Sequence, residues 1–396
     1  MGYKAGTDRR CGAISDSYEG TMQLTHSDTF NDQFEGPRAC FDYELPRVLD
    51  LLNAVFRIEA GRPPTFGRDR AQVYRPSNLD NIRVLFHNHE PVSVVTIFPA
   101  TTRSGSQALN VGGITGVATH SDFRKRGLAG IVLRDCHQRM LQNGYDIGLL
   151  NTGIVDWYRR FGWENGALER TFTLDRNVVR YLPTLTNAEI RSGAEECLEA
   201  VHALHGREPF VVERSSELTR ILLCRPHIAT FTAVRSHEVI AYAVVAHQTI
   251  LEYGGPTEDV AGLIGAIYRL MDDQAISTST RDRRRSVDSP TLHLKVVTPP
   301  LDDGFGGLLQ RLGIPAQFSY LGMIRIVNAR QLLGKLAPRV VVERDDEDEI
   351  RLRDGDDSRT VSRRDLVKLC FGPERVFRFA SDILPAPLYQ YRLDQV

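Results

Sequence analysis

The sequence predicts an α/β (α+β) protein built from mixed, twisted sheets with flanking helices. Three observations lead to this prediction. The chain has 396 residues, more than one hydrophobic core usually organises. Helical and β-type apolar periods alternate through residues 43–174, and a similar order of elements returns after Pro183. From Met323 the plan changes again, so we expect three domains.

The first predicted domain opens with a helix and three strands. Apolar residues recur at spacings of three and four from Leu45 to Val55, which places them on one helical face. Two β-rich runs, 83–86 and 92–98, flank a polar hairpin turn, and a third strand covers 108–119. The expected elements that follow are a helix at 128–142 closed by Asn143-Gly144, a strand at 147–151, a short helix at 155–160 and a strand pair at 163–174.

The rest of the chain yields a second and a third group of elements. For the second, we predict helices at 195–204 and 260–271, a hairpin of 228–234 with 239–247, a polar surface loop at 277–289, and strands at 291–298 and 318–326. For the third, we predict a helix at 329–336, strands at 340–343 and 350–353 around an acidic turn, and a helix at 364–370.

Composition narrows the function classes. A hydrophobic share of 42% with 25% charged residues is typical of a globular protein. The formal charge of -1 leaves no global field to recruit nucleic acid or an anionic membrane. Its six cysteines are scattered without a metal-binding spacing, which favours a reduced, cytoplasmic protein without zinc. We see no apolar segment of the length that export or membrane insertion requires.

One basic turn carries the strongest chemical signal. It follows the third strand and opens the helix at 128–142, where backbone N–H groups lack helical partners and the helix dipole is positive. Gly127 would let the backbone approach a phosphate closely. Such turns are often only solvated surface, but the order of elements around this one favours an anion site. The turn consists of Arg124, Lys125, Arg126, Gly127, Leu128 and Ala129.

At these residues the chain resembles the GNAT superfamily of N-acetyltransferases. The resemblance also includes Gly116-Val117-Ala118-Thr119 and the run from Trp157 to Trp163. It implies acetyl-CoA as the cofactor, with the pyrophosphate on the basic turn. It also implies that Val117, Ala118 and Thr119 offer backbone groups to the pantetheine arm, beside a slot where two strands diverge.

A narrower resemblance covers residues 36–396. The chain looks like the enhanced-intracellular-survival (Eis) family, because a second segment of GNAT-like order lacks the basic turn and because the run Arg364–Gly372 and the ending Asp394-Gln395-Val396 look like the close of that family's last domain. The resemblance implies an extension (1–36), a catalytic GNAT domain (37–182), a degenerate GNAT domain (183–322) and a sterol-carrier-protein-like domain (323–396).

The same resemblance assigns the catalytic roles. Tyr158 matches the tyrosine that protonates the leaving thiolate, and a phenol with a pKa of about 10 is protonated at neutral pH. Val396 would supply a terminal carboxylate that guides the amine. Asn151, at the end of the slot strand, is a candidate for the pantetheine amide. Each has a structural alternative: Tyr158 as packing, Val396 as a solvated terminus, and Asn151 as a partner of local backbone. We expect Asp156 and Glu164 only to solubilise the helix and the turn after it.

The residues alone do not identify the acceptor. The resemblance implies a primary amine on a small cationic molecule, such as an aminoglycoside or a polyamine, and a homo-oligomer, either hexamer or trimer. No metal, nucleic acid or membrane partner is expected. The alternative is a non-catalytic protein that uses the same scaffold to bind a CoA ester, a lipid or a partner protein.

Overall fold

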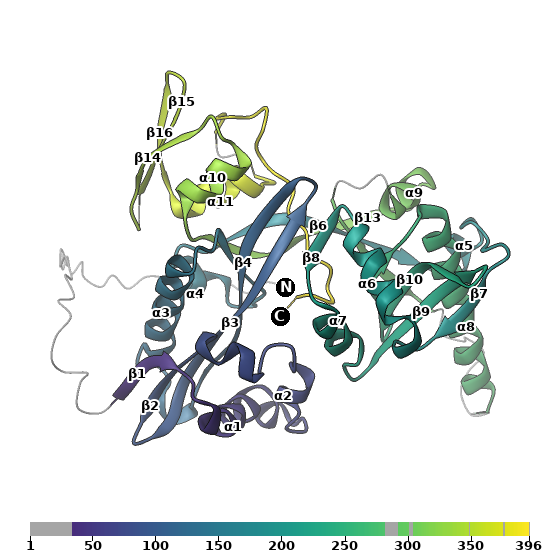
Figure 1. Ribbon diagram of the computed structural model, residues 1–396, viewed down its shortest axis with the longest axis horizontal. Coiled ribbons are helices and arrows are strands. Elements are labelled where there is room, and N and C mark those ends of the chain that lie inside the picture. The colour runs from purple at the N-terminus through teal and green to yellow at the C-terminus, as the bar shows by residue number, and fades with distance from the viewer. Residues whose placement is uncertain (1–33, 282–291, 301–303, 348, 375–376, 396) are drawn as a thin grey trace, which may run out of the picture.

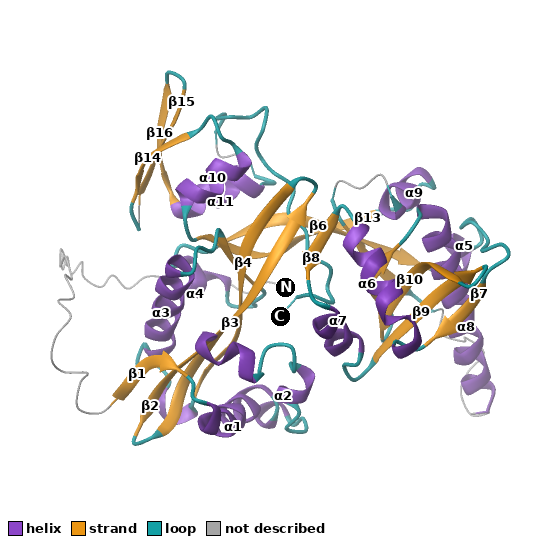
Figure 2. Ribbon diagram, in the orientation of Figure 1, coloured by secondary structure: helices purple, strands orange, loops and turns teal. Residues whose placement is uncertain are grey.

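The computed structural model describes residues 34–281, 292–300, 304–347, 349–374 and 377–395. They form a large mixed sheet with helices on its faces and a small antiparallel sheet set apart from it (Figures 1 and 2). None of the described helices is long and apolar enough to cross a membrane.

The N-terminal part of the large sheet forms the surroundings of the basic turn. Its strands are β1 (Phe34–Ala39), β2 (Ile82–His87), β3 (Glu90–Ser104), β4 (Gln107–Thr119) and β5 (Ile147–Leu150). Its helices are α1 (Leu45–Phe56), α2 (Phe66–Asp69), α3 (Leu128–Gln142) and α4 (Val155–Arg159). The predicted helices and strands of this part are confirmed to within a few residues, except that β3 runs on six residues past its predicted end at Phe98. The strand β1 and the helix α2 were not predicted.

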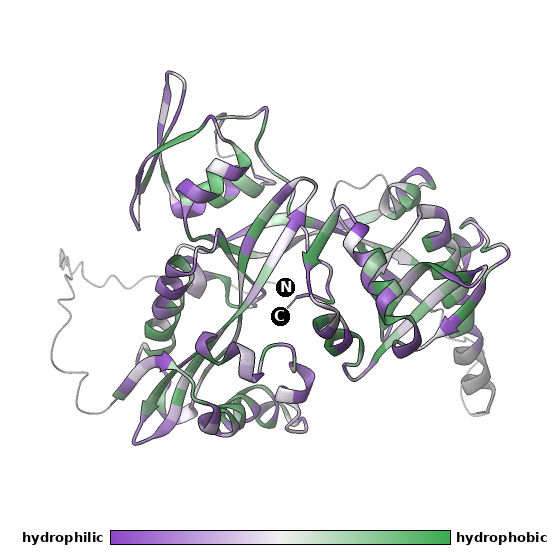
Figure 3. Ribbon diagram, in the orientation of Figure 1, coloured by the Kyte–Doolittle hydropathy of each residue, from purple (hydrophilic) through white to green (hydrophobic). Residues whose placement is uncertain are grey.

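The helices α1 and α3 cover this part of the sheet with separate apolar clusters. Val48, Leu51 and Leu52 of α1 are buried against β3 and β4. Leu128 and Val132 of α3 belong to a second cluster, which includes Trp163. Figure 3 shows hydrophobic and hydrophilic residues alternating around α3, the pattern of a helix with one face on a sheet. The end of α3 follows the predicted signal, since Gly144 takes a left-handed φ of 68°.

The large sheet continues through the second half of the chain. Its further strands are β6 (Glu164–Leu174), β7 (Glu189–Ser192), β8 (Phe210–Glu213), β9 (Ile228–Arg235), β10 (Glu238–Ala246), β11 (Thr249–Gly254), β12 (Leu294–Thr298) and β13 (Ala316–Ile326). The helices are α5 (Arg176–Val179), α6 (Leu198–Arg207), α7 (Ser216–Leu223), α8 (Thr257–Arg281) and α9 (Phe305–Arg311). The strand order is β1-β2-β3-β4-β5-β13-β6-β12-β11-β10-β9-β7, with β8 paired to β3.

The small sheet contains β14 (Val341–Asp345), β15 (Glu349–Asp354) and β16 (Asp357–Ser362), packed with α10 (Ala329–Leu336) and α11 (Arg363–Phe371). From α11 the chain returns as an extended segment, drawn in yellow, to the space between the two halves of the large sheet (Figure 1). Leu384, Leu388, Tyr389 and Leu393 of this segment are buried, so the segment is docked on the rest of the protein.

Several elements differ from the prediction. Residues 163–174 form the single strand β6 and not a pair, because β13 and β12 pair along its length. The loop predicted at 277–289 begins inside α8, which runs to Arg281, and its remainder lies outside the described residues. The third strand of the small sheet, β16, was not predicted. The predicted boundaries at 36 and 322 fall inside β1 and β13, respectively.

Candidate active site

The basic turn adopts a backbone conformation that suits an anion. Lys125 and Gly127 both have left-handed φ values, 63° and 78°. Gly127 is the N-cap residue of α3, and its carbonyl accepts from the N–H of Gly130 at 3.0 Å. The N–H groups that come before Gly130 in the first turn therefore have no intrahelical acceptor. Nothing lies within 4 Å of the position that a Cβ at Gly127 would take, so a phosphate has room there.

Protein partners hold two of the turn's cationic side chains in place. Arg124 donates from Nε to the Thr119 carbonyl at 3.1 Å and pairs with Glu59 at 2.5 Å. Arg126 donates to the Asp122 carbonyl at 3.1 Å, and its guanidinium lies 5.0 Å from the centre of the Phe123 ring. Both charges thus stand beside the exposed helix N-terminus.

Strand β4 carries a bulge immediately before the turn. Thr96 of β3 pairs with Thr115, and Val94 pairs with Ala118, so β4 has one extra residue between these pairs. Gly116 occupies the bulge with a φ of 60°, and a Cβ there would lie 2.0 Å from the Tyr74 hydroxyl. Only glycine fits both the conformation and the space.

The strands β4 and β5 separate next to this bulge. Their parallel register pairs Val111 with Ile147 and ends at Gly113 and Leu149, whereas β4 runs on to Thr119. The edge of β4 after Gly113 therefore does not pair with β5. The predicted pantetheine positions Val117, Ala118 and Thr119 lie on this stretch, so its backbone groups are placed to meet an extended ligand.

One apolar cluster joins the turn to Tyr158. Leu128 and Tyr158 are both core members of it, and Val117 packs against it. Ala129 is half-buried beside them. Gly130 also matters here, because a Cβ at that position would lie 2.9 Å from the Phe161 ring. Gly130 could not be singled out from the sequence, because a glycine inside a helix carries no signal of what it contacts.

Tyr158 combines burial with a protonated phenol. The side chain is 5% exposed, and its ring meets Trp157 edge-on at 4.7 Å between centroids. Burial raises the pKa of Tyr158 to about 12. The hydroxyl therefore keeps its proton at neutral pH and can act as a donor.

Glu164 holds the helix of Tyr158 in place. This carboxylate is 1% exposed and accepts from Arg159 of α4 at 2.8 Å and from Arg364 of α11 at 2.6 Å. It also accepts from the N–H of Asn165 at 3.0 Å. The expectation that Glu164 only solubilises a turn is wrong, because the carboxylate is buried between two arginines that come from different parts of the chain.

Asn151 lines a cavity of about 730 Å³. It follows β5 directly and donates from Nδ2 to Oε1 of Gln395 at 3.5 Å. The predicted catalytic Val396 lies outside the described residues. The cavity lining comes from the α1–α2 region, the β9–β11 hairpins, β13 and the C-terminal segment, and includes Arg57, Asp69, Arg70, Glu169, Arg225, Tyr320 and Arg392. None of these seven could be singled out from the sequence, because they are far apart along the chain and meet only in the fold.

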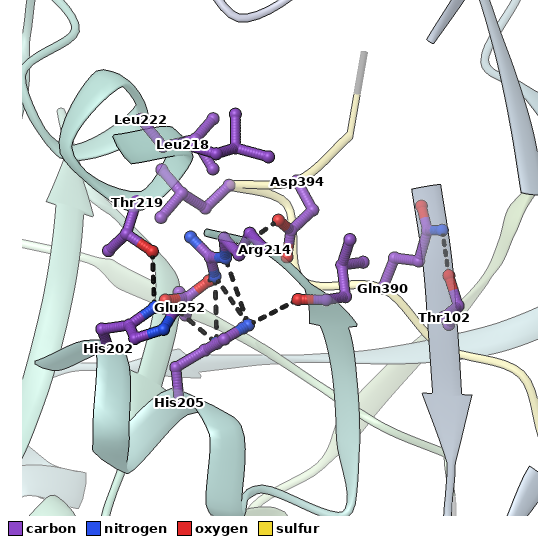
Figure 4. Close-up of polar contacts among 12 residues, drawn as sticks. Thr102, His202, His205, Arg214, Leu218, Thr219, Leu222, Glu252, Gln390 and Asp394 are labelled. Carbon is purple, nitrogen blue, oxygen red and sulfur yellow. Dashed lines mark hydrogen bonds and ion pairs between the residues drawn. The ribbon is translucent and has the colours of Figure 1, made fainter. Parts of the chain in front are cut away.

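A buried polar cluster anchors the C-terminal segment beside this cavity (Figure 4). Arg214, which follows β8, pairs with Glu252 and lies 3.4 Å from Oδ1 of Asp394. Arg225 donates to the Leu393 carbonyl at 3.0 Å. Gln390 donates to the Thr102 hydroxyl at 2.6 Å. These contacts determine where the residues before Val396 lie.

The same cluster brings three possible metal ligands together. Ligand atoms of His205, Glu252 and Asp394 lie within 4.8 Å of one another. The Arg214 guanidinium already stands among them, with Nε 3.1 Å from Nε2 of His205. A cation is therefore already supplied by the protein, and the contacts are explained by anchoring the segment.

Comparison with known proteins agrees with this geometry. Residues 37–166 match the model of the acetyltransferase (GNAT) domain family. Among curated proteins, none matches the sequence of the chain. Solved structures share its fold at low identity. Eis1 from Mycobacterium abscessus has a TM-score of 0.56 at 13% identity, with 83% of this chain and 84% of that chain covered.

Two further structures are similar over most of their length. A GCN5-related N-acetyltransferase from Kribbella flavida has a TM-score of 0.56 at 16% identity and covers 78% of this chain and 75% of its own. One from Anabaena variabilis has a TM-score of 0.54 at 15% identity, with coverages of 85% and 90%. Residues 37–166, which include the turn, the split strands and Tyr158, are therefore a GNAT acetyltransferase domain, of a family that uses an acyl-CoA substrate.

Proposed function

We propose that the protein transfers an acetyl group from acetyl-CoA directly to the primary amine of a small acceptor. The observation that carries this proposal is the open anion site at the start of α3, next to the unpaired edge of β4. Arg124 to Ala129 would hold the pyrophosphate, and the edge from Val117 to Thr119 would hold the pantetheine arm. Asn151 stands across the gap, at the end of β5.

The chain's own residues then supply orientation and protons. Acetyl-CoA supplies an activated thioester. The amine nitrogen forms a bond to the acetyl carbon, and the carbon–sulfur bond breaks. Tyr158 donates its proton to the departing sulfur, and a base accepts the proton that the amine loses. The terminal carboxylate of Val396 is our candidate to attract and orient the amine, since the docked segment brings Gln395 to Asn151.

A test separates this enzyme from a binding protein on the same scaffold. Thiol release from acetyl-CoA is measured with a panel of primary amines, and CoA affinity is measured by calorimetry. We expect amine-dependent thiol release together with CoA binding. Tight CoA binding without release for any amine would favour the non-catalytic alternative, in which the scaffold holds a CoA ester, a lipid or a partner protein.

Several finer predictions also remain proposals. The second half of the large sheet would be a degenerate GNAT domain, and the α10–α11 region with its small sheet would be sterol-carrier-protein-like. The assembly would be a cytoplasmic homo-oligomer, hexamer or trimer, without a metal. The expectation of an aminoglycoside or polyamine acceptor rests on the resemblance alone, and the charges in the cavity favour another class.

A further inference from the structure

Charge in the cavity beside Asn151 is predominantly positive. Its lining includes four arginines but only two carboxylates. Both carboxylates are already engaged by cations. Asp69 pairs with Arg57 at 3.0 Å, and Glu169 pairs with Arg392. The arginines would repel a polycation that enters this cavity, and Asp69 and Glu169 would offer it no carboxylate that is not already paired.

Arg70 and Arg225 are the two arginines in excess. In the described part of the chain, neither guanidinium has a carboxylate oxygen within 4.0 Å. Each instead donates a hydrogen bond to a neutral backbone carbonyl of the C-terminal segment. Arg70 donates to Gln395 at 3.4 Å, and Arg225 donates to Leu393 at 3.0 Å. Both side chains line the cavity.

The two guanidiniums also act on each other. Burial and then the charge of Arg70 lower the pKa of Arg225 to about 10. Arg225 therefore remains charged at neutral pH, at a cost that a bound anion would relieve. Guanidinium groups are planar donors that suit carboxylate and phosphate oxygens, and a half-buried pair gives such contacts strength.

We infer that the acceptor of this enzyme carries an acidic group, a carboxylate or a phosphate, in addition to its amine, and that Arg70 and Arg225 bind that group. The inference rests on the proposed acetyl transfer, because it names the substrate class of the same site. It replaces the cationic acceptor implied by the resemblance. The acidic group would hold the molecule in the cavity while its amine reaches the gap between β4 and β5.

The first arm of the test compares acceptors that differ in one acidic group. Phenylalanine is measured against phenylalaninamide and phenethylamine, and glucosamine 6-phosphate against glucosamine, with acetyl-CoA saturating. We expect kcat/KM to be roughly tenfold or more higher for the acidic member of at least one series, the size of a charge-assisted contact. The series in which the acidic member is preferred shows whether the site binds a carboxylate or a phosphate.

The second arm removes the proposed contact. Arg225→Gln and Arg70→Gln should lower kcat/KM roughly tenfold more for the acidic acceptor than for the partner that lacks the acidic group. Arg225→Lys keeps the positive charge and should therefore retain part of the preference for the acidic acceptor. Arg62→Gln, which removes an exposed arginine outside the cavity lining, is the matched control and should change neither value.

The outcomes separate the inference from the function on which it rests. Absence of acetyl transfer to every amine would overturn the proposed function. If kcat/KM is equal or higher for the acceptors that lack the acidic group, the inference alone is overturned. An equal loss for acidic and neutral acceptors in both arginine variants would also overturn it, because the pair would then hold part of the enzyme, such as the Val396 carboxylate.

Discussion

Asp394 and Arg214 form a buried ion pair, with Oδ1 of the carboxylate 3.4 Å from Nε of the guanidinium. Arg214 follows β8, the strand that joins the second half of the chain to β3. Asp394 belongs to the segment that brings Gln395 to Asn151. The pair therefore connects the packing between the halves of the sheet to the geometry of the cavity.

The ion pair should give protein stability a particular pH dependence. Burial raises the pKa of Asp394 to about 6, although Arg214 opposes the rise. Between an ordinary aspartate pKa of about 3.9 and this value, the folded protein binds more protons than the unfolded chain. The contribution of Asp394 to the free energy of unfolding thus decreases as the pH rises through that window, by on the order of 1 to 3 kcal/mol.

Asp394→Asn, which cannot titrate, is the reference for this prediction. Urea unfolding at pH 4, 5, 6 and 7 measures the free energy of unfolding of both proteins. We expect wild type to lose stability relative to the variant between pH 4 and 6 and to change little above that. Parallel curves for the two proteins would contradict the raised pKa.

Gly127→Glu should weaken CoA binding by at least about tenfold, equal to 1.4 kcal/mol. The substitution places bulk and negative charge where the pyrophosphate is proposed to lie, and a non-glycine residue at a φ of 78° is strained. Gly144→Glu is the control, because Gly144 has a φ of 68° and equally open space at the other end of α3. Isothermal titration should show normal CoA affinity for Gly144→Glu, and unchanged affinity in a folded Gly127→Glu protein would remove the turn from the site.

Tyr158→Phe should lower kcat by about 10²- to 10⁴-fold while CoA affinity stays nearly constant. The change deletes only the proton donor and keeps the ring that packs on Trp157. Tyr145→Phe is the matched control, because Tyr145 is a buried tyrosine of the same apolar cluster. Steady-state rates and titration calorimetry distinguish the two, and a similar small effect in both variants would assign Tyr158 to packing.

Appending a few residues after Val396 should lower acetyl transfer without changing CoA affinity. The segment before Val396 is held by Arg214 and Arg225, so added residues would move the terminal carboxylate away from the position that we propose for it. The same residues added before Met1 serve as the control. Full activity of the C-terminally extended protein would end the proposal that this carboxylate guides the amine, and would leave acetyl transfer itself intact.

Local sequence was sufficient to predict the parts of the site that local forces form. The basic turn, the start of α3 at Leu128 and the left-handed Gly144 all follow from residues within a few positions of one another. The hairpin of β2 and β3 is equally local. These features depend on backbone conformation and short-range periodicity, which a single sequence displays directly.

Only the tertiary structure decided which distant segments meet. Nothing near Gly166 indicates that β13 pairs with β6 and keeps residues 164–174 in one strand. The gap between β4 and β5 likewise depends on the register of strands that are far apart in sequence. Strand pairing of this kind is selected by complementary faces across the whole sheet, and the sequence of one strand does not specify its partner.

The charges that we propose to select the acceptor were also decided only by the tertiary structure. Arg70 and Arg225 are separated along the chain by most of the sheet, and each alone resembles an ordinary surface arginine in the sequence. Their proximity, their shared cavity and the absence of a carboxylate partner in the described residues arise when the end of α2, the loop before β9 and the C-terminal segment pack together. A motif recruits the cofactor through local backbone geometry, whereas the acceptor site is a product of long-range packing.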